Sequence, residues 1–216
     1  MPKAPKLIFL AIVLLSTPGC LVIGPRTVSV AELQTQPPSL MVAKRSDRLV
    51  YLVLDPARVP LECPVLVQGE DRGGRLQHLH TFVERDLKRA FENYFQTVRV
   101  VGPAAKAPPG SVVVDVAVKR VEINITSKAI NGYGNTVHSA GVGALTWSAA
   151  LRLAESDEYL FSFAGQSVGT PTDRPQHAVR TMLESAITDF FKGYTDKKVH
   201  RQLLGAPAVE EKPSTI

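Results

Sequence analysis

The stretch that decides the fold is VVVDVAVKRVEINI, Val112 to Ile125, in which apolar and polar side chains alternate. Side chains of a β-strand point to its two faces in turn, so this alternation predicts a strand with one buried face. The apolar residues occupy even positions as far as Val118 and odd positions from Val121 onward. Keeping one apolar face therefore requires an extra residue, and we predict a β-bulge at Lys119 and Arg120.

Other strands are expected on both sides of this one. Leu145 to Leu153 alternates cleanly, Glu155 to Glu158 reads as a turn, and Tyr159 to Gly165 alternates again, which predicts a hairpin. Upstream, RLVYLVLD, Arg48 to Asp55, is a nearly continuous apolar run and predicts a central strand buried on both faces. VRVV, Val98 to Val101, predicts a short strand.

Two segments have the three- and four-residue apolar spacing of amphipathic helices. The first stripe consists of Leu79, Phe82, Val83, Leu87, Ala90, Phe91, Tyr94 and Phe95. The second consists of Val179, Met182, Leu183, Ala186, Ile187, Phe190 and Phe191. Thr172 and Asp173 are suitable caps for the second helix, Pro175 fits its first turn, and we expect Gly193 to end it. The expected fold is α+β, a two-layer domain with a mostly antiparallel sheet of four or five strands packed against two helices.

The first residues have the pattern of an export signal. Lys3 and Lys6 precede the apolar run LIFLAIVLL, Leu7 to Leu15, and small and turn-forming residues follow it. A helix needs roughly 20 apolar residues to cross a bilayer, so this run is too short to remain as a membrane span. We interpret residues 1–19 as a signal peptide.

Cys20 follows Gly19 at the end of this signal, an arrangement that resembles the lipobox of bacterial lipoproteins. The resemblance implies that Cys20 carries diacylglycerol and palmitate-type acyl chains as the new amino terminus. In the sorting rule of enterobacterial lipoproteins, Leu21 after the cysteine implies an outer-membrane location, with the domain facing the periplasm. The alternative is a secreted or periplasmic soluble protein, because Thr17 and Gly19 also suit ordinary secretory cleavage.

Composition defines the expected organisation of the mature chain. Residues 20–47 contain several Pro, Gln and Ser and are expected to form a lipid anchor and flexible tether. Residues 48–204 are the expected periplasmic domain, and residues 205–216 a disordered tail. The full chain has a formal net charge of +5, without a long basic block or a Lys/Arg cluster interleaved with aromatic residues. Nucleic acid is therefore an unsuitable partner.

The chain has 2 cysteines, Cys20 and Cys63. An acylated Cys20 leaves Cys63 without an intramolecular partner, which excludes a disulfide framework. We interpret Cys63 as a small apolar residue at the edge of the core, the alternative being a reactive thiol.

GQSVG, Gly165 to Gly169, matches the G-x-S-x-G pattern of the serine hydrolase nucleophile elbow. An elbow requires a strand, a sharp turn with the serine at its tip, and a helix directly afterwards. Here SVGTPTDRP separates Ser167 from the next helix, and Asp173 and His177 lie on one helical turn beside it. We interpret the match as a coincidence and expect no enzyme. A secreted serine esterase using Ser167 is the alternative.

Metal and cofactor sites are not indicated. His78 and His80 are two residues apart on an expected helix, so they point to different faces, and no paired cysteine spacing occurs. GYGN, Gly132 to Asn135, lacks the third glycine and the helix of a dinucleotide loop. We expect no catalytic residue, no metal and no cofactor.

The segment NGYGNTVHSAGVG, Asn131 to Gly143, is rich in glycine and is expected to be a long connection between strands. Functional loops often have this composition. The candidate interaction residues are Gly132, Tyr133, Gly134, Val137 and His138. A pore-forming hairpin is disfavoured, because the segment is short for a membrane strand.

Taken together, Cys20, YLVLDP, FVERDLKRAFENYF, VVVDVAVKRVEI and AVRTMLESAITDFF are similar in order to YajG-like lipoproteins and to the auxiliary lipoproteins of ABC-type lipid transport systems. The resemblance implies a non-catalytic periplasmic module at the outer membrane that binds an envelope protein or a lipid carrier. The expected function is an adapter or accessory subunit of a cell-envelope complex. A subunit of an oligomeric envelope channel is a further alternative.

Overall fold

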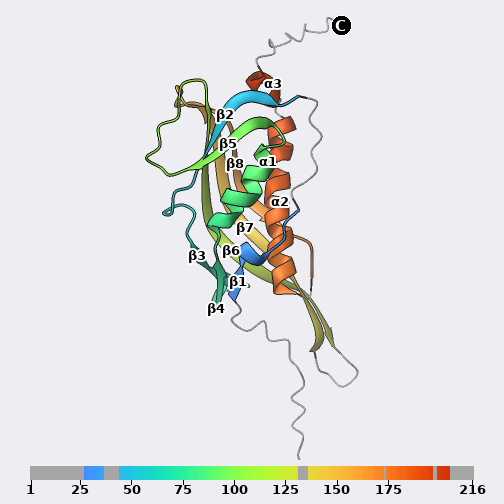
Figure 1. The fold of residues 1–216 in the computed structure, drawn as a ribbon. Coiled ribbons are helices and arrows are strands. Elements are labelled where there is room, and N and C mark those ends of the chain that lie inside the picture. Colours follow the sequence, from blue (N-terminus) through green and yellow to red (C-terminus); the bar gives the residue numbers. More distant parts are fainter. Residues whose placement is uncertain (1–26, 37–43, 131–135, 173, 197–198, 205–216) are drawn as a thin grey trace, which may run out of the picture.

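Strand β6 (Val112–Ile130) is the spine of the structure (Figure 1). The computed structural model describes residues 27–36, 44–130, 136–172, 174–196 and 199–204, with the backbone alone at 125–130, 136–139 and 196. The described strands form an eight-stranded sheet in the order β1-β4-β3-β6-β2-β5, and β7 and β8 continue it from the other edge of β6. The other strands are β1 (Thr27–Ser29), β2 (Ser46–Val53), β3 (Glu62–Val67), β4 (Glu70–Gln77), β5 (Phe95–Val101), β7 (Thr136–Leu153) and β8 (Tyr159–Val168).

Along one of its edges, β6 pairs first with β2 and then with β3. β2 pairs with residues 112–115 of β6, and β3 pairs with residues 121–123 on the same edge. β7 pairs with the other edge, and its register against β6 shifts between Val118 and Arg120. This confirms the predicted β-bulge at Lys119 and Arg120. The bulge lies where β6 passes from β2 to β3, and the N–H of Val118 there donates to the carbonyl of Arg58 instead (2.8 Å).

The α+β class is confirmed, but the expected sheet was too small. It has eight described strands rather than four or five, and four of the seven pairings between them are parallel. The chain between β2 and β5 contains the β3–β4 hairpin and the helical segments η2 and α1, a long connection of the kind that parallel strands require. The antiparallel hairpin of β7 and β8 is confirmed.

The hairpin of β3 and β4 is not among the strands that the sequence predicted. Pro64 suggested a loop, yet it lies just before the β3–β6 pairing starts at Val65, where β3 has one strand partner. Gln68 and Gly69 both have positive φ, 53° and 85°, as the two central residues of a tight hairpin turn require.

The helices are η1 (Val30–Glu32), η2 (Phe82–Leu87), α1 (Lys88–Phe91), α2 (Pro175–Asp196) and α3 (Val199–Leu203). Both apolar stripes expected from the sequence are buried. η2 is a π-helical segment that continues into α1, and the chain enters β5 at Phe95. No described helix combines the length and hydropathy that a membrane span requires.

Gly193 does not end α2, which continues to Asp196. A Cβ atom at Gly193 would lie 3.1 Å from Cζ of Phe161 on β8. Glycine at this position therefore serves the close packing of the helix on the sheet rather than its termination.

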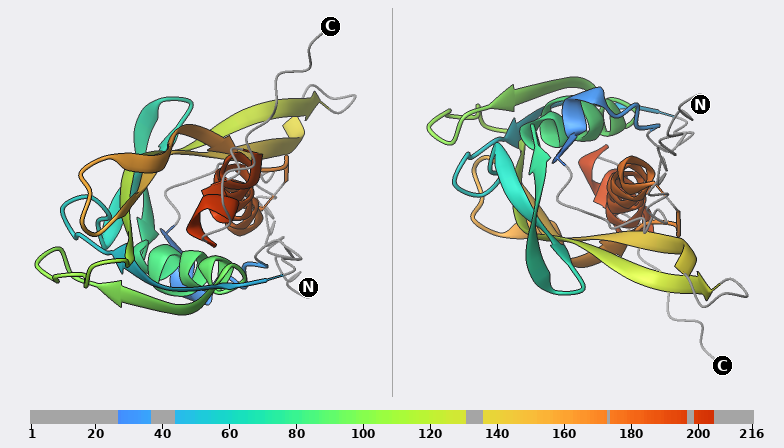
Figure 2. Two further views of the ribbon diagram at one scale, coloured as in Figure 1. Left: turned by 90° about the horizontal axis from the view of Figure 1, so that it is seen from above. Right: turned by 90° about the horizontal axis from the view of Figure 1, so that it is seen from below.

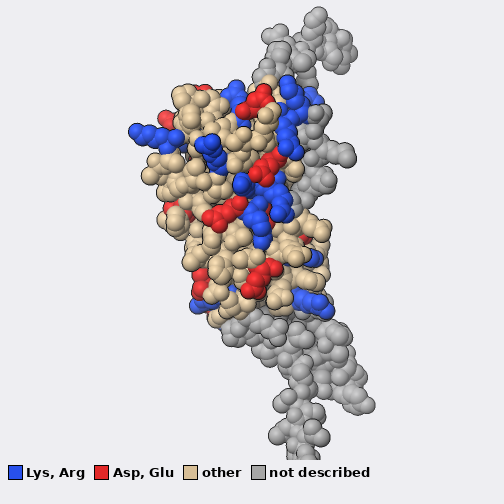
Figure 3. Space-filling model, in the orientation of Figure 1, with Lys and Arg blue, Asp and Glu red and all other residues tan. Residues whose placement is uncertain are grey.

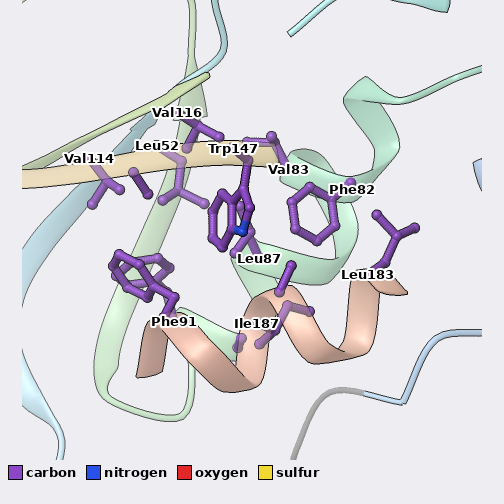
Figure 4. Packing of buried hydrophobic residues seen from close by; sticks show 14 of the residues in the cluster. Leu52, Phe82, Val83, Leu87, Phe91, Val114, Val116, Trp147, Leu183 and Ile187 are labelled. Carbon is purple, nitrogen blue, oxygen red and sulfur yellow. The ribbon is translucent and has the colours of Figure 1, made fainter. Parts of the chain in front are cut away.

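The core lies between the helices and one face of the sheet (Figure 4). Trp147 of β7 is completely buried at its centre. Its ring lies 5.9 Å from that of Phe82 on η2 and 6.1 Å from that of Phe190 on α2. Both helical segments therefore pack on the same face of the sheet.

The folded part of the chain begins before the expected boundary at Arg48. Residues 27–36, which we expected in the tether, contain β1 and η1, and β1 pairs in parallel with β4. Val30 is completely buried and Thr35 is 5% exposed. The short VSVAEL run, from Val28 to Leu33, supplies the apolar side chains that hold this segment to the core.

Candidate functional site

Ser167 of the GQSVG motif lies within β8, opposite Leu145 of β7, and not at the tip of a turn. It is 0% exposed, and its Oγ accepts a hydrogen bond from Nε1 of Trp147 (3.1 Å). His177 lies in the first turn of α2, and Asp173 lies outside the described residues. The described contacts give Ser167 a structural role, as the partner of a buried indole.

Replacing Ser167 with Ala is expected to lower the free energy of unfolding by about 1–2 kcal/mol, because the buried N–H of Trp147 loses its acceptor. Urea denaturation measures this. A Trp147→Phe/Ser167→Ala double variant should lose less than the sum of the single changes. Additive losses would show that the hydrogen bond contributes nothing, and loss of an esterase activity would contradict the structural role.

Cys63 lies in β3 and packs against the edge of the core. Burial raises the pKa of its thiol from 9.0 to about 11, so the thiol stays protonated at neutral pH. This agrees with the interpretation of Cys63 as a small apolar residue. A reactive cysteine has the opposite shift, because the thiolate is the nucleophile.

The two neighbouring histidines have separate partners. Nδ1 of His78 is 3.0 Å from Oγ of Ser29, whereas Nε2 of His80 is 3.6 Å from a carboxylate oxygen of Glu84. Among the residues that the structure describes, no cluster of three or more His, Cys, Asp or Glu could hold a metal ion.

The segment 27–36 is fastened to the domain by a polar cluster, which we call the latch: Thr35 and Asp86, which are buried, and Arg85, which is partly buried. Asp86 is 0% exposed, accepts from Oγ1 of Thr35 (2.5 Å) and pairs with Arg85, whose Nε lies 2.7 Å away. Nη1 and Nη2 of Arg85 donate to the carbonyls of Ala31 and Val30 (both 3.2 Å). A buried carboxylate is stable only when it is paired and hydrogen-bonded, and both conditions are met here.

A groove of about 440 Å³ lies on the open face of the sheet, opposite the helices. Its floor and walls are Tyr51, Val53, Asp55, Arg58, Val101, Pro103, Ala105, Lys106, Ala107, Val113, Asp115, Arg152 and Ala154. Tyr51 and Val113 face it because Val50 and Val112, their neighbours along the strands, face the core. No Ser, Thr, Cys or His is among these described lining residues.

The walls of this open-face groove are held by hydrogen bonds at its rim. The backbone N–H of Gly110, at the end of the loop 102–110, donates to a carboxylate oxygen of Glu155 (2.7 Å), and Nη1 of Arg48 donates to the Gly110 carbonyl (3.0 Å). The Gly110 contact lowers the pKa of Glu155, which keeps it ionised. The loop is therefore attached to the turn between β7 and β8.

Charges in the open-face groove centre on Asp115, which lies between two arginines. The Nη1 atom of Arg58 and the Nε atom of Arg152 are each 3.7 Å from a carboxylate oxygen of Asp115. A guanidinium has five N–H donors, more than these contacts use, so both arginines can also receive an acidic group of a ligand. A groove that combines apolar and charged side chains suits the binding of a polypeptide segment. The one sequence signal for this site is Asp115 itself, an acidic residue within an apolar run.

The opposite, helical face is salt-bridged rather than strongly charged. Figure 3 shows basic and acidic side chains interspersed over it. On α1 the ammonium of Lys88 is 3.8 Å from a carboxylate oxygen of Glu92, and on α2 Nε of Arg180 is 3.9 Å from one of Glu184. Pairs spaced four residues apart on a helix surface are typical of a solvated face.

His200 of α3 connects this helix, through hydrogen bonds, to α2 and to the residue Lys44 shortly before β2. Its Nδ1 is 3.1 Å from the Tyr194 hydroxyl and its Nε2 is 3.2 Å from the Lys44 carbonyl. The neutral ring fits both, with Nε2–H donating to the carbonyl and Nδ1 accepting from the hydroxyl. Burial lowers the pKa of His200 below 6.5, although the Lys44 contact opposes the shift.

Stability should therefore fall as the pH decreases from about 6.5 through the lowered pKa of His200. In that range the unfolded chain binds a proton at this residue and the folded chain does not. Urea midpoints at pH 7.5 and 5.5 measure the effect, with His200→Gln as the control that lacks this titration. An identical pH dependence in the two proteins would show that His200 does not contribute.

The sequence-predicted site residues lie mostly outside the described part of the chain. Cys20, Gly132, Tyr133 and Gly134 are outside it. Val137 and His138, expected in a loop, belong to β7, where His138 pairs with Ala129 of β6, so the loop was wrong and their role in an interaction stays a prediction. The glycines that suggested a loop serve packing in part, because a Cβ atom at Gly143 would meet the backbone of α2.

No protein-family model and no curated protein matches this sequence. Among solved structures, a Xanthomonas campestris protein of the family DUF330 is 15% identical over 82% of this chain and 97% of its own, with a TM-score of 0.51. A putative neuraminyllactose-binding hemagglutinin homolog from Helicobacter pylori is 10% identical over 80% and 99%, with a TM-score of 0.37. The uncharacterized lipoprotein B from Nitrosomonas europaea is 15% identical over 80% and 89%, with a TM-score of 0.31.

The likeness to the Xanthomonas protein shows a shared fold and nothing further about activity. The two likenesses of lower TM-score carry no argument, although one of the proteins is named as a lipoprotein. None of the three is named as YajG-like, so that resemblance stays an expectation.

Proposed function

We propose that this protein is an outer-membrane lipoprotein that acts as a non-catalytic adapter in the cell envelope. The observation that carries the proposal is the attachment of the segment 27–36. It begins seven residues after Cys20 and is built into the core through Val30 and the latch. A lipid on Cys20 would therefore hold the whole domain close to the leaflet, where an adapter has to work.

The adapter role is supported by the chemistry of the open-face groove. Its described lining combines apolar side chains with two arginines and contains no serine, threonine, cysteine or histidine. Ser167 is buried and bonded to Trp147. These features favour binding over covalent catalysis, and the groove is the surface that we assign to the partner.

The anchor is tested by incorporation of radiolabelled palmitate and by intact mass, in a Gram-negative host. The wild type and a Cys63→Ala control should both incorporate label and fractionate with the outer membrane, and Cys20→Ala should do neither. An intact mass that matches unmodified cleavage after Gly19 would overturn the proposal and make the protein a free periplasmic or secreted one.

The groove is tested by photo-crosslinking in cells. A crosslinking residue at Ala105, in the groove wall, should give a discrete product that disappears when Arg58 and Arg152 are changed to Glu. The same residue at the exposed Gln202 on α3 should not give that product. Equal products from both positions would remove the groove from the proposal and leave the anchor unaffected.

A further inference from the structure

The end of the long hairpin extends beyond the rest of the sheet. The pairing of β3 with β6 ends at Ile123, and the pairing of β8 with β7 ends at Ala144. From there the two long strands pair with each other as far as Ile130 and Thr136, and Gly141, at the base of this section, also bridges to Thr172. We call the described strand residues 125–130 and 136–141 the arm, and Figure 1 shows it projecting from one end of the molecule.

The chain from Cys20 enters the domain at this same end. β1 runs parallel to β4, so its first residue lies on the side of the tight turn at Gln68 and Gly69. The backbone N–H of Gln68 donates to the carbonyl of Ile123, at the base of the arm (3.2 Å). β1, the β3–β4 turn and the arm therefore share one end of the molecule, while α3 lies at the other (Figures 1 and 2).

The tip of the arm lies farther along the strands from the level of Thr27 than the chain between Cys20 and Thr27 can extend. Seven residue steps separate Cys20 from Thr27, which is at most about 25 Å of extended chain. The strand pairings show which part of β6 lies level with Thr27. Thr27 pairs with Arg75, which pairs with Pro64, and the neighbouring Val65 pairs with Val121, so Thr27 lies level with the residue before Val121. From that level, β6 continues for about ten residues to Ile130, roughly 33 Å of strand. A leaflet that holds Cys20 therefore lies within reach of the arm.

The composition of the arm suits the headgroup layer of a membrane. Residues 125–130 and 136–141 contain Lys128 and His138 and no Asp or Glu. The positive charge of Lys128, with no acidic residue beside it in the arm, has the sign that lipid phosphates attract. Small and polar residues fill most of the remaining positions, so the arm lacks the apolar band of a membrane-spanning strand.

We propose that the arm rests on the surface of the same leaflet that anchors Cys20, so that lipid and arm together orient the domain. This inference rests on the proposed function, since it takes Cys20 as the membrane anchor. The lipid on Cys20 and the arm would together restrict the rotation of the domain relative to the membrane, which one flexible tether cannot do. The open-face groove is then presented to its partner in a defined direction, and the end that carries α3 points away from the membrane.

The test places a fluorophore at the arm and measures its distance from lipid. In a Cys63→Ala chain acylated at Cys20, an NBD label on Ala129→Cys is compared with one on Gln202→Cys of α3, in vesicles containing headgroup spin-labelled lipid. Quenching of the arm label should exceed that of the α3 label at least threefold. Equal quenching of the two labels would overturn the proposal.

A second pair of proteins separates this inference from the anchor itself. The mature chain with Cys20→Ser and Cys63→Ala, labelled at Ala129→Cys, is held on nickel-chelating vesicles by a histidine tag at either its amino or its carboxyl terminus. The label on the arm should be quenched when the tag is at the amino terminus and not when it is at the carboxyl terminus. If the arm is quenched with the amino-terminal tag but Cys20 proves unmodified in cells, the proposed function is wrong and the geometry of the arm stands. If Cys20 is acylated but the arm label is not quenched, the proposed function stands and the orientation by the arm is wrong.

Discussion

Replacing Asp86 with Ala is expected to lower the free energy of unfolding by about 3 kcal/mol, a large effect for one residue. Asp86 accepts from Thr35 and pairs with Arg85, and its removal leaves both donors without their acceptor. The value lies at the low end for a broken buried ion pair, because the Arg85 side chain is 29% exposed and can turn toward water. Urea denaturation measures the loss.

The same substitution should also release the segment 27–36. Two carbonyls of this segment, those of Val30 and Ala31, accept from Arg85, whose position depends on Asp86. Hydrogen exchange at 27–36 should therefore speed up more than exchange in β6. Glu84→Ala is the matched control, since Glu84 is an exposed neighbour on the same helical segment. A control that loses as much stability, or unchanged exchange at 27–36, would show that the latch does not hold the segment.

The latch also shows what periodicity cannot predict. Every residue of the first apolar stripe is buried as predicted, because the three- and four-residue spacing depends on the helix alone, although Leu79 and Tyr94 lie outside η2 and α1 and Phe95 begins β5. Asp86 lies beside that stripe and looks like a solvated residue in the sequence. It is buried because a segment some fifty positions earlier, at Thr35, packs over it. A partner so distant in sequence leaves no local pattern.

The strands show the same division between local and distant causes. The bulge at Lys119 was predictable, because a one-residue slip in alternation has one simple explanation. β3 and β4 were missed because Pro64 and the glycines beside Arg75 suggest a loop, and pairing with β6 overrides that preference. The parallel pairings depend on which strands meet after a crossover, which alternation does not encode.

The candidate site was less predictable than the fold. The open-face groove brings together Arg58, Asp115 and Arg152 from three separate segments. Before the pairing of β2 with β6 is known, nothing connects them. The GQSVG motif presents the opposite case, a clear local pattern whose serine faces a tryptophan in the core. The environment of Ser167 in the fold, rather than the sequence motif, decides its role.

Replacing Gly143 with Ala should cost about 3 kcal/mol or more, because α2 leaves no space for a side chain there. A Cβ atom at this position would lie 2.5 Å from the carbonyl oxygen of Ala178 and 3.1 Å from Cβ of Met182. The first contact is with backbone, so the helix itself has to shift. Denaturant unfolding measures the cost, and Gly102→Ala, which meets no atom within 4 Å, is the control.

Gly169 provides an independent check of this explanation. A Cβ atom there would lie 2.6 Å from the backbone nitrogen of Met182, and its own N–H donates to the Gly143 carbonyl (2.9 Å). Both substitutions push the same part of α2 away from the sheet. Once the first has moved the helix, the second should cost less, so the double variant should lose less stability than the sum of the single ones. Strictly additive losses would mean that each clash is relieved locally. A small loss of stability in the Gly143→Ala variant alone would mean that α2 is held less closely to β7 and β8 than the packing of Trp147 against Phe190 implies.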